Sequence, residues 1–300
     1  MGDRFVVLGA GLIGASLVAS LRQQFPLSEI NVLSRSAPRH LMSYDVDVTL
    51  GEIGDGALRG YFRDGDTVFM AHGVASPRCS TRDARQVSLP ILHSATEVVE
   101  ELSDVRSGRV VVFSSGGAVY GPSSQPVDEN CPSAPSTIYG ATKLAEEVLI
   151  GQLEHTNDPT TVLVLRCSTV YGLRAPGIYA QGLVQTILEH VNAKTPVPIF
   201  GRGLSRRGYI HSMDVANIAI HLILAEDRQS KVYNVCSGDI RSINDVINAV
   251  ARVVDRRVDT VHTPAEDFDI VLSSSLLRNE FPSISACRLE QGIERMLSQA

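Results

Sequence analysis

The 300-residue sequence lacks the residue spacings of a metal site or a disulfide framework. Its five cysteines are scattered, without any CxxC motif, at Cys79, Cys131, Cys167, Cys236 and Cys287. None of the eight histidines pairs with Cys, Asp or Glu at metal-ligand spacing on a readable helix. We therefore expect reduced thiols and no bound metal.

Long apolar runs and an excess of basic charge are also missing. No uninterrupted apolar run approaches ~20 residues, and no basic leader or cleavage site precedes the first apolar segment. The formal net charge of −6 and the pI near 5.8 lack the basic surplus that attracts nucleic acid, although a local basic pocket is compatible with them. We expect a cytoplasmic protein without nucleic-acid or membrane partners.

The chain does contain a regular alternation of short apolar runs with helical patterns. With 44% hydrophobic residues it can bury a substantial core. The apolar runs cover residues 4–10, 30–35, 66–73, 109–115 and 160–168. This rhythm predicts an α/β fold with a doubly wound parallel sheet, because buried parallel strands read as continuous apolar runs joined by crossover helices.

The rhythm loosens after Gly172, where loops containing Pro and Gly separate the helical patterns. We expect residues 1–172 to form the nucleotide-binding domain and residues 173–300 to form mainly a smaller, substrate-binding lobe. A late strand candidate at 231–238 suggests that residues 211–236 return to the large sheet.

The first motif is a glycine-rich turn between the first strand and a helix predicted for residues 11–24. Its three glycines, Gly9, Gly11 and Gly14, stand in a G-x-G-x-x-G frame. Such a frame allows a tight turn, a close approach of the backbone to pyrophosphate and close packing of helix on strand. We therefore expect a dinucleotide here, with Leu12 and Ile13 at the helix start also in contact with it.

The end of the second strand bears on the choice between NAD and NADP. An Asp or Glu there receives the ribose 2′-hydroxyl of NAD, whereas this chain has Ser34 and Arg35. A guanidinium forms charge-assisted bonds with a 2′-phosphate, so NADP is slightly favoured over NAD. The alternative interpretation makes Arg35 a solvated loop cation.

The second motif, YGATK, places Tyr139 and Lys143 one helical turn apart on the same face. A phenol with a pKa near ~10 is a poor base at neutral pH, and a nearby ammonium stabilises its phenolate. Tyr139 is therefore a candidate acid/base, although an ordinary surface pair has the same spacing.

Together the segments SSGGAVYG, YGATK, LRCSTVYG and GRGLSRRGYIHSMDVA resemble the extended short-chain dehydrogenase/reductases, and specifically their nucleotide-sugar epimerase/dehydratase group. The resemblance runs from about residue 4 to the end of the chain. It implies a Rossmann domain and hydride exchange between a nicotinamide and a sugar carbon, usually C4. Tyr139 would be the acid/base, Lys143 would bind the nicotinamide ribose and lower the pKa of Tyr139, and Arg207 would hold the nucleotide diphosphate, with Arg206 the weaker candidate.

The resemblance is broken where the family commonly carries a catalytic Ser or Thr, because this chain has Gly116. Ser115 is our first candidate for the missing hydroxyl and Ser114 the second, with water or a backbone donor as the fallback. The acid pair of the family's dehydratases is replaced by Gly117 and Ala118, which disfavours dehydration.

Other positions differ in detail. Glu52 stands where the family often has an acidic residue after its third strand, and we expect Glu52 and Ile53 to contact the cofactor, with a solvated Glu52 as the alternative. Thr169 replaces an Asn of the family, and we expect it to contact the substrate. We expect a nucleotide-sugar epimerase, with a 4-keto reductase as the alternative. A non-catalytic dinucleotide-binding protein and a dehydrogenase for another substrate are less favoured. The resemblance also implies a homodimer formed through helices at about 86–102 and 139–153.

Overall fold

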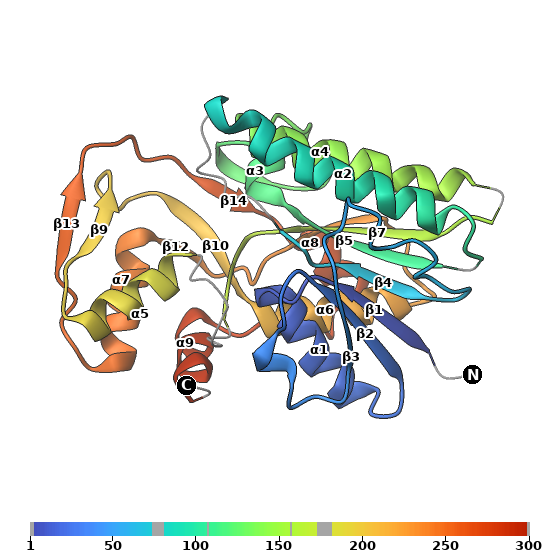
Figure 1. The fold of residues 1–300 in the computed structure, drawn as a ribbon. Coiled ribbons are helices and arrows are strands. Elements are labelled where there is room, and N and C mark those ends of the chain that lie inside the picture. The colour runs from blue at the N-terminus through green and yellow to red at the C-terminus, as the bar shows by residue number, and fades with distance from the viewer. Residues whose placement is uncertain (1–2, 74–80, 107, 157, 173–181, 299–300) are drawn as a thin grey trace.

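The chain forms a parallel sheet between two helical layers, with a smaller lobe beside the carboxyl ends of the strands (Figure 1). The structure is a computed structural model that describes residues 3–73, 81–106, 108–156, 158–172 and 182–298. Cys79 and most of the loop after Gly172 lie outside the described residues. The other four cysteines are free thiols.

The large sheet has seven parallel strands in the order β11-β7-β5-β4-β1-β2-β3. Its central strands are apolar and almost fully buried, which is why they are readable as continuous hydrophobic runs. The strands in chain order are β1 (Arg4–Leu8), β2 (Glu29–Ser34), β3 (Asp47–Leu50), β4 (Thr67–Met70), β5 (Arg109–Ser115), β7 (Thr161–Cys167) and β11 (Val232–Val235).

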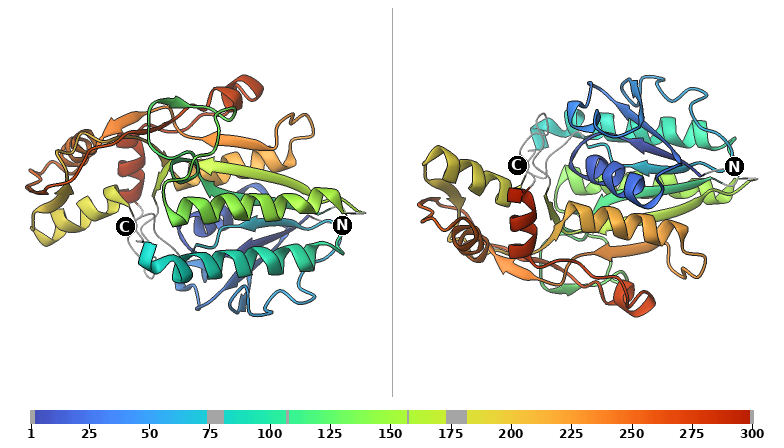
Figure 2. Two further views of the ribbon diagram at one scale, coloured as in Figure 1. Left: turned by 90° about the horizontal axis from the view of Figure 1, so that it is seen from above. Right: turned by 90° about the horizontal axis from the view of Figure 1, so that it is seen from below.

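Two pairs of long helices cover the two faces of this sheet. The first pair is α1 (Leu12–Gln24) with α6 (Ser212–Leu224), and the second is α2 (Ala84–Leu102) with α4 (Ile138–Gly151). Figure 2 shows the second pair from above and the first from below. Each pair buries an apolar cluster against its own face of the sheet. The Rossmann doubly wound fold predicted from the sequence is therefore confirmed.

Short elements complete the large domain. They are the helices α3 (Gly116–Tyr120) and α8 (Ser275–Glu280), and the 3-10 helices η1 (Arg39–Leu41), η2 (Thr81–Asp83) and η3 (Gln152–His155).

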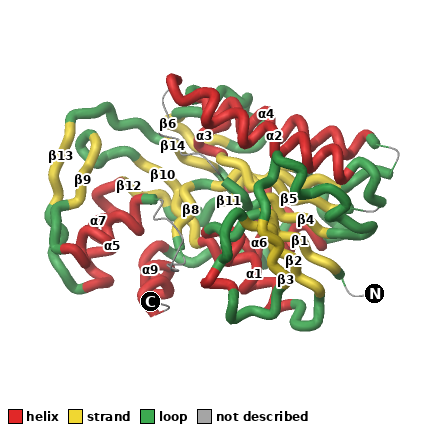
Figure 3. Tube along the Cα trace, in the orientation of Figure 1, coloured by secondary structure: helices red, strands yellow, loops and turns green. Residues whose placement is uncertain are grey.

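The smaller lobe contains two further sheets and its own core (Figure 3). One sheet has the order β12-β10-β14-β6, with β8 also paired to β10, and the other pairs β13 with β9. The strands are β6 (Ser123–Val127), β8 (Thr169–Tyr171), β9 (Val197–Phe200), β10 (Arg206–His211), β12 (Ile240–Ser242), β13 (Thr260–Thr263) and β14 (Ile270–Leu272). The helices are α5 (Leu183–Ala193), α7 (Ile243–Val254) and α9 (Leu289–Ser298).

The chain crosses between the two parts more than once. After β10 it returns to the large sheet through α6 and β11. We propose a domain boundary at residue 172, with residues 211–236 belonging to the domain of the seven-stranded sheet. Among the helices in the described part of the chain, none combines the length and apolar character that crossing a bilayer requires.

Candidate functional site

The glycine turn after β1 is shaped by close backbone contacts. Gly9 has a φ of +102°, and its N–H donates to the Leu33 carbonyl at 2.8 Å. A Cβ at Gly9 would lie 2.6 Å from the Cα of His72, and a Cβ at Gly14 would lie 1.9 Å from the Gly9 carbonyl oxygen. Both positions therefore require glycine, because backbone atoms fill the space of a side chain.

Gly11, in contrast, faces open space: among the described residues, apart from its neighbours in the chain, no atom lies within 4 Å of its Cβ position. It caps α1 without a side-chain hydrogen bond, and the first turn of α1 contains no acidic residue. The N–H groups of Leu12, Ile13 and Gly14 thus have no partner within the helix, and the positive end of the helix dipole is uncompensated. This end of α1 fits a dinucleotide pyrophosphate.

The ribose end of the cradle brings two opposite charges together. Arg35 follows β2 and Glu52 follows β3, and the two side chains are 3.8 Å apart, from Nη1 to Oε1. Both are more than half exposed. Ser34 donates its hydroxyl to the Ser36 carbonyl at 2.9 Å, and Ile53 packs onto the apolar cluster beneath. The pair can present either a carboxylate or a guanidinium to a ribose.

Tyr139 and Lys143 lie in the first turns of α4, whose N-terminus is capped by Thr137. The Thr137 hydroxyl accepts from the N–H of Gly140 at 3.1 Å. A Cβ at Gly140 would lie 2.1 Å from the Ala118 carbonyl oxygen, so α3 and α4 approach more closely than any other residue would allow. This approach brings the start of α4 beside the end of β5.

The electrostatics of Tyr139 differ from the sequence-based expectation. Burial raises the pKa of its phenol, and the opposing charge of Lys143 does not overcome this effect. Glu146 and Cys167 raise the pKa further. Tyr139 is therefore a protonated phenol in the resting protein, because desolvation penalises the phenolate more than one partly neutralised ammonium stabilises it.

Lys143 is deeply buried and forms an ion pair with Glu146, one turn further along α4. Burial opposes its charge, but Glu146, Tyr139 and Glu147 outweigh that effect and raise the pKa of the ammonium. Lys143 is consequently a cation at neutral pH.

The two serines at the end of β5 have different surroundings. Ser114 is buried and donates its hydroxyl to Glu147, which also binds Arg166 at 2.8 Å. Ser115, on the opposite face of the strand, is half-buried, and within the described residues its hydroxyl has no hydrogen-bond partner. Ser114 is therefore held in a structural network, whereas Ser115 is free to contact a ligand.

Gly116 and Gly117 face the apolar interior beneath α3. A Cβ at Gly116 would lie 2.4 Å from Leu272 Cδ1, and one at Gly117 would lie 2.7 Å from Ile270 Cγ2. Both neighbours come from β14, a strand of the smaller sheet. Side chains of β14 thus fill the space that a side chain at position 116 or 117 would need.

The expected substrate residues lie on neighbouring strands. Thr169 in β8 is half-buried and pairs with Tyr209 of β10. Arg207, also in β10, is half-buried, with its guanidinium 4.9 Å from the centre of the Phe268 ring. Arg206 points elsewhere, because its exposed side chain pairs with Asp269 at 2.7 Å. Phe268 was not predicted, and no spacing in the sequence links it to Arg207.

His72, which follows β4, is packed against α2. Its Nε2 lies 2.8 Å from the Ser94 hydroxyl, which itself donates to a carbonyl, so Nε2 carries the proton. Burial, with smaller contributions from Lys143 and Arg35, lowers the pKa of His72 to about 3. His72 is therefore neutral and is no general acid at neutral pH.

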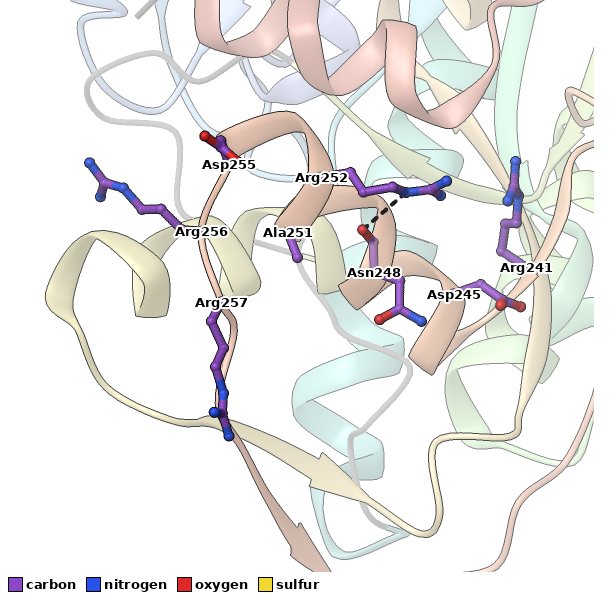
Figure 4. A pocket seen from close by; sticks show the side chains of 8 residues that line it. All are labelled: Arg241, Asp245, Asn248, Ala251, Arg252, Asp255, Arg256 and Arg257. Carbon is purple, nitrogen blue, oxygen red and sulfur yellow. Dashed lines mark hydrogen bonds between the residues drawn. The ribbon is translucent and has the colours of Figure 1, made fainter.

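A surface hollow of about 690 Å³ lies away from the strand ends, on the smaller lobe (Figure 4). Two of its arginines, Arg241 and Arg252, share the carboxylate of Glu290 at 3.5 and 3.0 Å. Arg256 and Arg257 extend in different directions from the end of α7. These are ion-paired or solvated charges rather than a convergent site. No cluster that could hold a metal ion occurs among the described residues.

The chain belongs to the NAD-dependent epimerase/dehydratase family, whose model matches residues 5–236. This confirms the resemblance to extended short-chain dehydrogenase/reductases. The family includes nucleotide-sugar epimerases, dehydratases and reductases.

Individual relatives are distant and differ in reaction. UDP-glucose 4-epimerase 4 of Oryza sativa is 26% identical over 214 residues, covering 63% of this chain and 58% of that protein. The dTDP-4-dehydro-6-deoxyglucose reductase of Escherichia coli is 22% identical over 305 residues, covering 96% of this chain and 94% of that protein. Other curated relatives include dTDP-glucose 4,6-dehydratases.

Among solved structures, the Thermus thermophilus UDP-glucose 4-epimerase in complex with NAD matches with a TM-score of 0.86 at 23% identity. The match covers 99% of this chain and 98% of that one. At this identity the likeness establishes the shared fold.

Proposed function

We propose that this protein is an NAD(P)-dependent nucleotide-sugar epimerase that oxidises the sugar at C4 to a transient ketone and then reduces it on the opposite face. The observation that carries the proposal is the placement of Tyr139 and Lys143. The close approach at Gly140 sets them beside the end of β5, at the edge of the sheet where the glycine cradle opens. A dinucleotide held by that cradle would extend along this edge.

Each residue of the site has a distinct role in the proposed reaction. Bound nicotinamide supplies a hydride acceptor and donor for the sugar carbon. Tyr139 removes the hydroxyl proton of the sugar during oxidation and returns it during reduction. The N-terminus of α4 and the Lys143 ammonium both favour the phenolate that oxidation requires. Ser115 donates a hydrogen bond to the sugar oxygen, while Ser114 fixes Glu147 and Arg166 behind it.

Dehydration is disfavoured because it needs a second acid and base beyond Tyr139. The two positions that would carry them are Gly117 and Ala118, and Ile270 blocks a side chain at Gly117. Arg207, stacked on Phe268, is the proposed contact for the nucleotide diphosphate, and Thr169 lies nearby on the adjacent strand. A planar guanidinium suits that bidentate role.

The proposed cofactor is NADP or NAD, with NADP slightly favoured. Arg35 can form charge-assisted bonds with a 2′-phosphate, and Glu52 can accept from a 2′-hydroxyl. Their mutual contact at 3.8 Å means that the choice depends on which partner the ribose displaces.

A second candidate, an NADPH-dependent reductase of 4-keto nucleotide sugars, is favoured by Arg35 and by the protonated state of resting Tyr139. The reductase relative from Escherichia coli, aligned over nearly its whole length, is consistent with it. A non-catalytic dinucleotide-binding protein would not need Tyr139 beside the buried ammonium of Lys143.

We further propose that the protein is cytoplasmic, that it binds a nucleotide-diphosphate sugar and that it forms a homodimer. The paired helices α2 and α4 expose Leu89 and Val148, at 37% and 58% of their surface, which provides apolar area for a second copy.

The test is turnover of UDP- and GDP-sugar panels with NAD or NADP. An epimerase inverts the sugar, seen by NMR, without net consumption of cofactor, whereas a reductase bleaches NADPH absorbance. Tyr139→Phe should abolish either activity while cofactor affinity stays within about twofold. Tyr61→Phe, at the opposite edge of the sheet beside Arg4, is the matched control and should remain active. A fully active Tyr139→Phe protein would refute the assignment.

A further inference from the structure

Glu146 is a buried acid in direct contact with the lysine assigned to the cofactor. Its side chain is 2% exposed and that of Lys143 is 7% exposed, and the two form an ion pair across one turn of α4. An acid three residues from a lysine on a helix is ordinarily a solvated pair on the surface. Here the pair lies inside the protein, where the interaction between charges is stronger because solvent screening is weak.

The other ionisable groups around Lys143 are already engaged or neutral. Glu147 binds Arg166 and Ser114. Cys167 on β7 is a buried thiol whose pKa is raised to about 12, chiefly by burial. His72, after β4, is neutral because burial lowers its pKa to about 3. Within the described residues, Glu146 is the hydrogen-bond acceptor of the Lys143 ammonium.

We propose that Glu146 is a positioning residue that holds the Lys143 ammonium in place and offsets its charge, thereby setting the pH range in which Tyr139 can exchange a proton. This inference rests on the proposed roles of Tyr139 and Lys143. Glu146 touches neither sugar nor cofactor in the proposal, and acts through Lys143.

Removing the Glu146 charge is expected to change the ionisation of both Tyr139 and Lys143. Without the carboxylate, the full charge of Lys143 acts on Tyr139, so the phenol ionises at lower pH. Lys143, still buried but without its counter-ion, gives up its proton at lower pH as well. Burial raises the pKa of Glu146 and the Lys143 ammonium opposes that shift, so the pair is coupled in both directions.

The experiment compares Glu146→Gln with the wild-type protein. Tyr139 ionisation is followed by ultraviolet absorbance of the phenolate, as the difference between each protein and its Tyr139→Phe counterpart. We expect the titration to move down by about one pH unit in Glu146→Gln. In the pH profile of turnover, the acid limb, set by ionisation of Tyr139, and the alkaline limb, set by loss of the Lys143 proton, should both move to lower pH. Glu146→Asp keeps the charge at a longer distance and should fall between the two.

The matched control is Glu100→Gln, which removes an exposed carboxylate from α2 and should leave both readouts unchanged. A Tyr139 titration that does not move, or moves upward, in Glu146→Gln overturns the proposal. If Glu146→Gln does not fold, Glu146→Asp provides the test, because a Tyr139 titration that does not shift in that variant also overturns the proposal. The absorbance readout requires no turnover. A shifted titration without activity on any nucleotide sugar therefore refutes the proposed function and not the role of Glu146.

Discussion

Replacing Gly116 with serine would restore a hydroxyl where the family commonly carries one, yet we expect it to impair the protein. A Cβ there would lie 2.4 Å from Leu272 Cδ1, 3.1 Å from Cδ2 and 3.2 Å from the Arg166 carbonyl oxygen. Leu272 is 4% exposed and packs in a small core with Tyr120 and Val127, so its end must move by roughly 1 Å to reach normal contact.

The magnitude follows from two opposing effects. Overpacking of this kind costs about 1–3 kcal/mol, while replacing glycine in the first turn of a helix recovers less than about 1 kcal/mol. Gly116→Ser should therefore lower the free energy of unfolding by about 1–2 kcal/mol. Turnover should not rise, because the new side chain points toward Leu272, in the apolar interior beneath α3.

A double-mutant cycle with Leu272→Ala isolates this contact. Leu272→Ala alone costs about 2–5 kcal/mol through its cavity, but it also makes room for the serine. The double variant should thus be more stable than the sum of the single effects by about 1–3 kcal/mol. Urea unfolding followed by far-ultraviolet circular dichroism suits a chain without tryptophan. Additive effects, or a more active Gly116→Ser protein that no longer needs Ser115, would refute the reasoning.

Two further predictions concern the cofactor end of the sheet. Glu52→Gln should raise the preference for NADPH over NADH, because it frees Arg35 from its ion pair. Arg35→Ala should weaken NADPH binding by about tenfold and leave NADH binding unchanged. Calorimetric titration measures both affinities, and equal effects on the two cofactors would contradict the role assigned to Arg35. The cofactor-free protein should also lose stability as pH falls from about 6.5 toward 3, because His72 stays neutral in the folded protein while its counterpart in the unfolded chain takes up a proton. The free energy of unfolding should fall by at most ~1.4 kcal/mol per pH unit over this range. His72→Gln should flatten that slope in urea unfolding at pH 7 and pH 5, and an unchanged slope would show that other groups cause it.

The parallel core was predictable because its signal is local. Each central strand buries both faces and so reads as an apolar run, and the Gly9 turn follows the first of them directly. Strand β3 has a weaker signal, since its four residues are exposed at the edge of the sheet. The strands β6 and β14 were not predicted, because pairing between residues about 150 positions apart stabilises them rather than any local pattern.

The candidate site likewise has features that a local sequence pattern predicts and features that depend on tertiary structure. The spacing of Tyr139 and Lys143 follows from helix geometry, so a sequence pattern suffices to pair them. Spacing cannot show that Glu146 is buried, nor that the Ser114 hydroxyl donates to Glu147 in a buried network. The obstacle at Gly116 comes from β14, at the far end of the chain, and becomes visible only when the smaller sheet is assembled.

The charge balance of the site bears on the direction of the reaction. Lys143 and Glu146 form one neutral buried pair, and Arg166 and Glu147 form another, so little net positive charge is left to ionise Tyr139. Reduction of a ketone begins with a protonated phenol, which the resting protein already has. Oxidation of an alcohol begins with a phenolate, and here that requires added positive charge beside Tyr139, such as an oxidised nicotinamide carries. The two candidate reactions therefore start from opposite protonation states of one side chain. Oxidation should strengthen as pH rises through the Tyr139 titration, whereas reduction should weaken over the same range.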